Sequence, residues 1–202
     1  MKIGPKYKIA RRLKSPVFEK TQTQKFVLSE SKKAPASRRQ RGPTDYGRQL
    51  LEKQKARYSY LLTEKQFSRY VAEATRRKDK KNADALFENL ESRLDNVVLR
   101  LGFAPTRSAA RQMVSHGHIL VNDRKMTIPS YRVSIGDTIR IKETSLNKGL
   151  SVNLDERLKT VNVPVWLSLD VTKKEGAIAK KPILEGNDLL FDIQSVLEFY
   201  SR

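Results

Sequence analysis

Residues 107–122 form the stretch RSAARQMVSHGHILVN, which begins with a helical pattern and ends with the alternation of a strand. Thr106 precedes the stretch as a candidate N-cap, and Gly117 separates the two patterns because glycine ends a helix easily. In the strand, Ile119 and Val121 share one side. The helical part predicts an inward apolar face composed of Ala109, Ala110, Met113 and Val114. These signals indicate a helix that leads directly into a sheet.

The polar side of this predicted helix carries Arg107 and Arg111, which lie one turn apart and therefore point from a single face. We expect both side chains to be exposed, either as a solvated surface or as a site for an anion. His116 and His118 flank the helix end, but no acidic or thiolate residues accompany them as a metal site would require. We therefore expect His116 to contact phosphate or sugar and His118 to be a strand residue.

Downstream of this stretch the pattern predicts a small sheet. Residues 122–125, NDRK, form a polar turn, residues 126–128 return as a strand, and Pro129 interrupts that strand. Residues 136–142, GDTIRIK, then close the sheet with alternating side chains. The inward positions are Ile139 and Ile141, and the outward positions are Arg140 and Lys142.

Upstream, residues 83–103, ADALFENLESRLDNVVLRLGF, predict one continuous helix. Arg93 and Arg100 lie on another face than its apolar residues, and Gly102 supplies a left-handed C-terminal cap. The apolar residues recur every three or four positions, at Leu86, Leu90, Leu94, Val97 and Leu101.

Two further helices are predicted before residue 83. The first starts near Asp45, with Thr44 or Asp45 itself as N-cap, and the second starts at Thr63. At the other end, residues 192–202, DIQSVLEFYSR, carry a helical apolar face that needs a partner. Its members are Ile193, Val196, Leu197 and Tyr200, and we expect Leu190 to be buried beside them.

Charge restricts the function. The 202 residues contain 41 Lys and Arg against 22 Asp and Glu, which gives a net charge of +19. Such an excess indicates an anionic partner, with nucleic acid first and an acidic membrane surface second. The bases run through most of the chain rather than along one amphipathic helix, which favours a long polyanion. No apolar run approaches the ~20 residues of a spanning helix, and the start MKIGPKYKIARR lacks a signal-peptide core.

Residues 1–44 hold 13 basic and two acidic residues and are interrupted by four prolines. We expect this segment to be a basic arm that cannot bury enough apolar surface to fold alone and that orders on RNA. The sequence has no cysteine, which excludes disulfides and thiolate metal sites.

Several segments in order resemble the family of the fourth protein of the small ribosomal subunit, in its bacterial form. They are DYGRQLLEKQKARY, TEKQFSRY, ESRLDNVVLRLGFAPTRSAARQMVSHGHILVN, IPSYRVSIGD, VPVWLSLD and DIQSVLEFYSR, together with GPK at residues 4–6. The resemblance spans about 160 residues, from residue 45 to the end. It implies an α+β fold in which a mainly helical domain, residues 45–91 plus 173–202, contains an inserted RNA-binding domain, residues 92–172. That inserted domain would be a helix pair on a small, strongly bent β-sheet, preceded in the chain by the basic arm.

The same resemblance implies a function. Members of the family bind small-subunit ribosomal RNA at a multi-helix junction early in assembly. They later line the messenger entry path beside the third and fifth small-subunit proteins and affect decoding accuracy. We therefore expect a structural protein of the cytoplasmic ribosome, with no membrane partner. Many members also bind zinc through cysteines in the N-terminal segment. This chain has none, so no zinc and no other cofactor are expected.

The charge pattern and the resemblance together predict which residues contact RNA. Tyr46, at a helix start, is the best candidate among the tyrosines for stacking on a base. In the inserted domain the predicted residues are Arg93, Arg107, Arg111, Gln112, Ser115, His116, Asn122, Arg124 and Lys125. In the helical domain and the arm they are Tyr46, Arg48, Lys53, Lys55, Arg57, Lys6, Arg11, Arg12, Arg38, Arg39 and Arg41.

An enzymatic function also has to be considered, and we do not expect one. Residues 92–95, SRLD, resemble the core of pseudouridine synthases, where the aspartate is a nucleophile on a loop of a large catalytic domain. Here Asp95 continues into a helical pattern and that domain is missing, so Asp95 is better explained as the partner that orients an arginine. No phosphate-binding glycine loop, nucleophile elbow or HExxH occurs. A stand-alone RNA-binding factor would lack the helical region from residue 45, and a membrane-surface protein would bind liposomes in competition with RNA.

Overall fold

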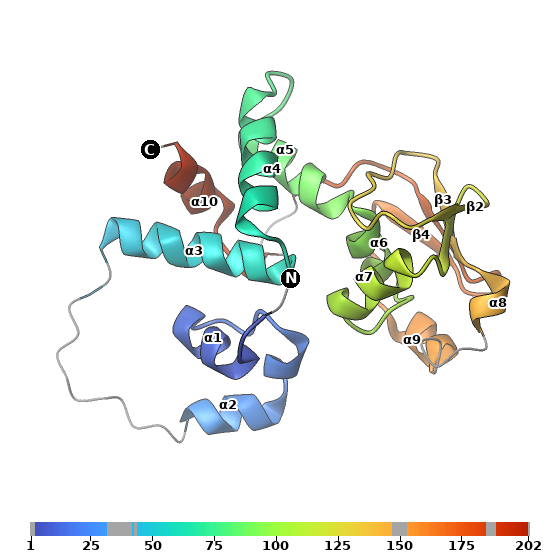
Figure 1. Ribbon diagram of the computed structural model, residues 1–202, viewed down its shortest axis with the longest axis horizontal. Helices are drawn as coiled ribbons and strands as arrows, with labels where there is room; N and C mark the ends of the chain where they lie inside the picture. Colours follow the sequence, from blue (N-terminus) through green and yellow to red (C-terminus); the bar gives the residue numbers. More distant parts are fainter. Residues whose placement is uncertain (1–2, 32–41, 43, 147–152, 185–188, 202) are drawn as a thin grey trace. The chain divides into compact units, whose positions relative to one another are not determined.

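The structure is a computed structural model that describes residues 3–31, 42, 44–146, 153–184 and 189–201 (Figure 1). Its contacts divide the chain into two compact units. The first comprises Met1–Ala83 with Glu185–Arg202, and the second comprises Asp84–Leu184. The first unit is helical and the second combines helices with a five-stranded antiparallel sheet, so the expected α+β class is confirmed.

Two helices with threonine caps form the frame of the first unit, α3 (Asp45–Ser59) and α4 (Glu64–Arg76). Thr44 Oγ1 accepts a hydrogen bond from Gly47 N at 3.2 Å, and Thr63 Oγ1 accepts one from Gln66 N at 3.3 Å. Each cap satisfies one of the amide groups that a helix start leaves unpaired. The buried residues of α4 are Phe67, Tyr70, Val71 and Ala74, as its periodicity predicts.

The C-terminal helix α10 (Ile193–Tyr200) packs on α3 and α4 although more than a hundred residues separate them in the chain (Figure 1). Asp192 caps α10 by accepting from Gln194 N at 3.0 Å. Ile193 and Val196 are buried, which provides the partner that the apolar face of the tail requires. Leu190, expected to be buried with them, is 46% exposed because it lies before the helix starts.

Residues 3–31 also fold as part of the first unit, which corrects the expectation of an arm that orders only on RNA. They form α1 (Lys6–Leu13), a short 3-10 helix, η1 (Glu19–Thr21), and α2 (Gln24–Ser31). The prolines do not prevent this, since Pro5 occupies the N-cap of α1, outside its hydrogen-bonded turns. The buried residues Ala10, Leu13, Val17, Phe18 and Phe26 pack against Leu51, Tyr58 and Leu61 from α3 and the turn that follows it.

The predicted continuous helix over residues 83–103 is wrong, because the chain breaks at Ser92 and Arg93 into α5 (Asn82–Glu91) and α6 (Leu94–Arg100). At the break, three backbone hydrogen bonds join residues 92–95 to residues 129–133 in place of hydrogen bonds within a helix. Leu94 N donates to Tyr131 O at 2.9 Å, Asp95 N to Pro129 O at 3.1 Å, and Val133 N to Ser92 O at 2.9 Å. The predicted apolar positions are nevertheless all buried. Leu94, Val97 and the C-cap Leu101 of the second helix belong to the core that the sheet and α7 (Arg107–Ser115) share.

The sheet of the second unit has the strand order β2-β1-β3-β5-β4. The five strands are β1 (Ile119–Val121), β2 (Arg124–Met126), β3 (Thr138–Ile141), β4 (Leu167–Asp170) and β5 (Glu175–Ile178). Val121 pairs with Arg124, so Asn122 and Asp123 alone form the turn, both with positive φ, and β2 starts two residues before the predicted strand. Residues 175–178, expected in the helical domain, belong to this sheet because β5 pairs with both β3 and β4.

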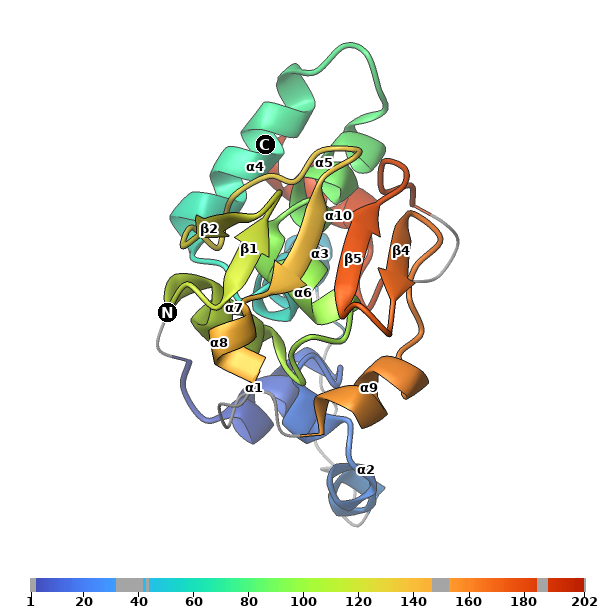
Figure 2. The same ribbon diagram turned by 90° about the vertical axis from the view of Figure 1, so that its right-hand side faces the viewer.

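One face of the sheet is covered by α6 and α7 (Arg107–Ser115), as Figure 2 shows. The predicted inward residues Ile119, Val121, Ile139 and Ile141 are all buried there. Gly176 of β5 lies so close to Leu101 that a Cβ at this position would collide with the leucine side chain. Two short helices, α8 (Glu143–Leu146) and α9 (Leu154–Thr160), complete the unit. Within the described residues, no helix is long and apolar enough to cross a membrane.

Candidate RNA-binding surface

The position of α7 follows from local signals on both sides of it. Gly102, with φ +78°, ends α6, and Thr106 Oγ1 caps α7 by accepting from Ala109 N at 3.1 Å. Ala110, Met113 and Val114 are buried, whereas Ala109 is only partly buried. The packing of α7 therefore also fixes its two arginines, which lie beside the inward face and next to α6.

Arg111 is held by a carboxylate from the interior. Arg93 donates from Nε and Nη2 to the two oxygens of Asp95 at 3.0 and 2.8 Å, and Arg111 donates from Nε to Asp95 Oδ2 at 2.8 Å. The Arg93 and Asp95 side chains are 2% and 1% exposed, and that of Arg111 is 25% exposed. Asp95 is thus the ion-pair partner that orients an arginine, as the sequence indicates.

Arg107 is held by a second buried group. Its Nη2 donates to Asn96 Oδ1, while Asn96 Nδ2 donates to Glu91 Oε2 at 2.9 Å. Arg100 adds two hydrogen bonds to the same carboxylate, at 3.0 and 3.1 Å. Glu91 is completely buried, so both arginines of α7 are anchored through groups of α5 and α6 that solvent does not reach.

This network gives two of the predicted residues an internal role. Arg93 is buried and engaged with Asp95, which argues against its predicted contact with RNA. Arg111 was expected to be exposed, but its side chain is only 25% exposed and bonds to the same buried carboxylate. Its predicted contact with RNA stays a prediction. Sequence reasoning missed Glu91 and Asn96 altogether. A signal for Glu91 was available, since it is an acid two residues before Arg93 in a stretch whose neighbouring leucines are predicted to face inward.

The β1–β2 hairpin adds a second basic edge beside the end of α7. Arg124 and Lys125 are exposed, and the Lys125 side chain runs across Gly117, where any Cβ would collide with it. Gly117 has φ +71°, a conformation that also favours glycine. His116, at the C-cap of α7, is exposed. The helix end and the hairpin therefore form one continuous surface, to which Gln112, Ser115 and His116 also belong.

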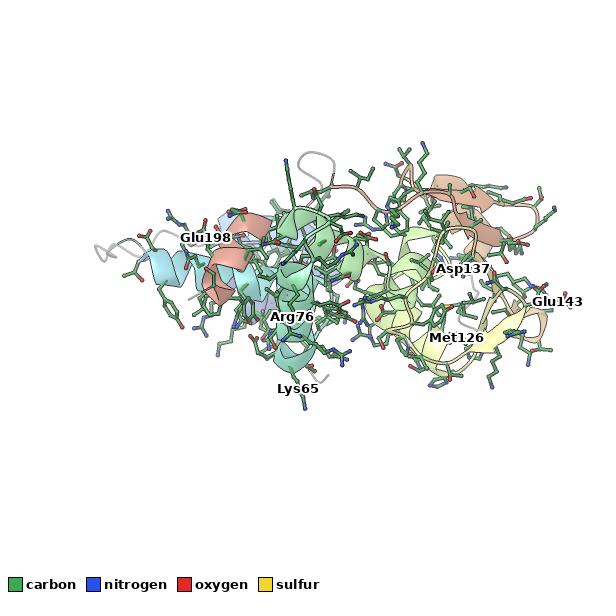
Figure 3. The ribbon with its side chains drawn as sticks, turned by 90° about the horizontal axis from the view of Figure 1, so that it is seen from above. Lys65, Arg76, Met126, Asp137, Glu143 and Glu198 are labelled. Carbon is green, nitrogen blue, oxygen red and sulfur yellow. The ribbon has the colours of Figure 1, made fainter. Side chains whose placement is uncertain are left out.

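Asn122 has an internal role in this hairpin. Its Nδ2 donates to Asp137 Oδ1 at 2.7 Å, and its Oδ1 accepts from Thr138 N at 2.9 Å (Asp137 is labelled in Figure 3). The side chain thus ties the turn to β3. The predicted RNA contact of Asn122 remains a prediction, since the residue is exposed. His118 also has an internal partner, with Nδ1 2.9 Å from Ser145 Oγ.

The predicted residues of α3 divide by exposure. Lys53 is buried and its Nζ lies 2.9 Å from Glu64 Oε1, which argues against a direct contact with RNA. Lys55 pairs with Glu52 and is partly exposed. Arg57 lies 3.8 Å from Glu64 and over the ring of Tyr58. On the solvent side are Arg48, which pairs with Asp45, and Tyr46, which is 52% exposed with its ring 5.6 Å from that of Phe199.

In the N-terminal segment, Lys6 lies over the ring of Phe18, and Arg11 donates to Ser29 Oγ at 3.3 Å. Arg12 is exposed. The predicted contacts Arg38, Arg39 and Arg41 lie outside the described residues. Among the residues that the structure describes, no cluster of three or more His, Cys, Asp or Glu side chains could hold a metal ion.

One polar cluster couples the tail to α3 and α4. Tyr200 Oη donates to Glu64 Oε1 at 2.6 Å, and Gln49 Nε2 donates to Glu198 Oε2 at 3.0 Å (Glu198 is labelled in Figure 3). Burial raises the pKa of Tyr200 above its usual value, and its bond to Glu64 raises it further. Burial alone would raise the pKa of Glu64, but hydrogen bonds from Tyr200 and Lys53 outweigh it and lower that pKa.

Comparison with known proteins covers both units. The model of the S4 domain matches residues 92–139, and that of the ribosomal protein S4/S9 N-terminal domain matches residues 1–91. The small ribosomal subunit protein uS4 of Herpetosiphon aurantiacus is 48% identical over 83% of this chain and 80% of that protein. The proteins of the same name from Roseiflexus castenholzii and Leptothrix cholodnii are 45% and 40% identical, each over 99% of this chain and 98% of the relative. Because the likeness extends over nearly the whole length of both chains, this chain belongs to the bacterial-type family of small ribosomal subunit protein uS4.

Proposed function

We propose that this protein is a primary binder of small-subunit ribosomal RNA, which it contacts at a multi-helix junction through α7 and the β1–β2 hairpin. As a member of the uS4 family it is a structural protein of the cytoplasmic ribosome, it binds RNA there, and it is not an enzyme. Beyond family membership, we propose the junction as the binding site and the residues that contact it.

The anchoring of Arg107 and Arg111 is the observation that carries the proposal. Four guanidinium groups, from Arg93, Arg100, Arg107 and Arg111, surround only two buried carboxylates, those of Glu91 and Asp95. The cluster therefore keeps an excess of positive charge next to the surface. Arginines fixed before binding lose little conformational entropy when they meet phosphate, which favours affinity. Guanidinium groups also hold phosphate oxygens by paired hydrogen bonds, which a lysine cannot do.

The hairpin supports the same conclusion. Arg124 and Lys125 present charge beside the C-terminal end of α7, while Arg107 lies at its N-terminal end. An RNA backbone could run along this helix between the two charged regions. A-form RNA is recognised mainly through its shape and backbone, so this surface would select a folded junction more than a base sequence.

We extend the proposal to the later roles that the family resemblance implies. These are a position at the messenger entry path beside the third and fifth small-subunit proteins, and an influence on decoding accuracy. Cross-linking of assembled subunits that carry a photoreactive group at exposed Tyr46 tests the positions. If Tyr46 formed no cross-link to the third protein, the fifth protein or RNA, the proposed positions would be contradicted.

The direct test measures binding to the isolated RNA junction. Arg124→Glu with Lys125→Glu should weaken binding by about tenfold or more, because it places two negative charges against the backbone. Lys173→Glu with Lys180→Glu is the matched control, since both lysines are exposed in the same unit and flank the strand at the other side of β3. Equal losses in both variants would mean that only net charge matters, and would reject the surface.

The salt dependence provides a second measurement on the unmodified protein. Each neutralised phosphate contributes a log–log slope of roughly −0.7 to −0.9, so several engaged bases should give an overall magnitude of at least about four. A flat response, or equal affinity for an unrelated RNA of the same length, would contradict specific binding.

A further inference from the structure

A hollow of about 200 Å³ opens between α1 and α3 in the first unit. Its apolar wall comes from Leu13, Leu50 and Leu51, and its polar side chains are Arg12, Gln54 and Arg57. It lies in a different unit from the surface made by α7 and the hairpin. Nothing in the function proposed above uses it.

Two polar atoms at this hollow lack partners. Gln54 Oε1 and Arg57 Nε are buried, and within the described part of the chain neither has a hydrogen-bond partner. A buried acceptor or donor without a partner costs ~1–3 kcal/mol. A bound group that offers both a donor and an acceptor on one edge would relieve that cost.

The chemistry of the lining excludes several classes of ligand. Among the described residues that line the hollow there is no carboxylate, so its lining does not suit a metal ion or an organic cation. Its volume is below the roughly 300–1,000 Å³ of pockets that enclose drug-sized molecules, so it has room for a single ring system. Two guanidinium groups beside apolar side chains favour a flat ring that carries an anionic group.

We propose that this hollow receives one unpaired nucleotide of the bound RNA. Its base would lie against the leucine side chains with its polar edge toward Gln54, and its phosphate would meet Arg12 and Arg57. Tyr58 forms a fixed wall, since Phe18 packs against its ring edge to face at 5.9 Å and Arg57 lies over it at 4.6 Å. Every base has both donors and acceptors along its edge, so this pocket would accept unpaired nucleotides of more than one type.

The proposal rests on the RNA-binding function and adds a second, base-accepting contact to it. It differs from the α7 surface in what it recognises. That surface would bind the backbone of folded RNA, whereas the hollow would bind a base that the fold leaves unpaired. The two contacts can therefore fail independently.

The test uses the full chain with labelled leucine and isoleucine methyl groups in NMR titrations. Adenosine monophosphate should shift the methyl signals of Leu13, Leu50 and Leu51, while inorganic phosphate and ribose 5-phosphate should not. A single-stranded hexanucleotide should shift the same signals, and the same sequence in a duplex should not. If phosphate alone produces the shifts, or if the duplex does so equally, the hollow is not a base pocket.

Two variants separate this contact from the rest. Arg12→Gln should weaken mononucleotide binding by about tenfold, because it removes a charge-assisted hydrogen bond. Lys8→Gln is its matched control, since Lys8 is exposed on the same helix and does not line the hollow. Equal binding by both variants would overturn the pocket. If the pocket were overturned in this way but Arg124→Glu with Lys125→Glu still weakened binding to the junction, the proposed function would stand without the pocket.

Discussion

The two units hold their basic residues in different ways. In the second, Arg93 and Arg111 converge on Asp95, whose side chain is 1% exposed. In the first, Lys53 and Arg57 meet Glu64, whose side chain is 44% exposed. A buried pair that loses one member leaves an uncompensated charge, whereas an exposed pair is replaced by water at small cost. The buried pair of Arg93 and Asp95 is therefore structural, whereas the partly exposed Glu64 of the first unit contributes less.

Removal of the tail is the strongest test of the apolar packing in the first unit. Deleting residues 187–202 removes the buried side chains of Ile193 and Val196, each worth ~1.5–3 kcal/mol at full burial. We expect the first unit to lose at least about 3 kcal/mol while the second keeps its structure. Thermal unfolding and NMR of the full-length and truncated chains measure both. An unchanged melting curve would mean that α10 contributes nothing to the first unit.

Asp95→Ala tests the second unit. It leaves Arg93 buried without its carboxylate, so we expect a loss of about 3–5 kcal/mol in the free energy of unfolding. The double variant Arg93→Met with Asp95→Leu should recover most of the loss, because apolar groups of similar size can replace a buried pair. Chemical denaturation measures each. If Asp95→Ala alone costs less than about 1 kcal/mol, the pair is not structural.

Tyr200→Phe tests how much the hydrogen bond between Tyr200 and Glu64 stabilises the first unit at high pH. The raised pKa of Tyr200 means that its neutral form stabilises the fold below the unfolded value near 10. That stability is lost as pH rises toward the higher folded pKa. The wild type should therefore lose stability above about pH 10, and Tyr200→Phe should lose less over the same range. At neutral pH the free energy of unfolding of the variant should be ~1 kcal/mol lower than that of the wild type. If the stability of both proteins fell equally as pH rose above about 10, the role of Tyr200 would be disproved.

Glu64→Gln should have the smallest effect. Because the pKa of Glu64 is lowered in the folded state, its stabilisation is present above the unfolded value of 4.5 and is lost as pH falls through the folded value. Solvent screens this partly exposed group, so we expect a change of less than about 1 kcal/mol near neutral pH. Unfolding measured from pH 7 down to 3 should be less pH-dependent in the variant. A loss as large as that of Asp95→Ala would remove the contrast between the units.

Local signals account for what could be predicted from the sequence. The caps at Thr63 and Thr106 and the left-handed Gly102 were predicted, because each depends on residues within one helical turn. Thr44 was one of two predicted caps, and Gly117 was predicted as a helix end. The buried positions in α7 and β3 followed from periodicity in the same way, and the excess of positive charge indicated a nucleic-acid partner.

The candidate site was only partly predictable. Exposed Arg124, Lys125 and His116 match the predicted surface, but Arg93 and Lys53 are buried against carboxylates that lie elsewhere in the fold. Their residue type alone suggested contact with RNA. Whether a basic side chain faces solvent or a buried acid depends on the arrangement of helices, which no local pattern specifies.

The sequence by itself thus determined the charge of the protein, the caps of α4 and α7, and the apolar side of α7, β1 and β3. Tertiary structure decided the rest. The break at Ser92 exists because residues 129–133 offer backbone partners, and β5 joins the sheet because β3 and β4 lie on both sides of it. Residues 3–31 fold because α3 covers their apolar side. In each case the deciding interaction comes from residues far along the chain, and its free energy exceeds the local preference that a sequence pattern can express.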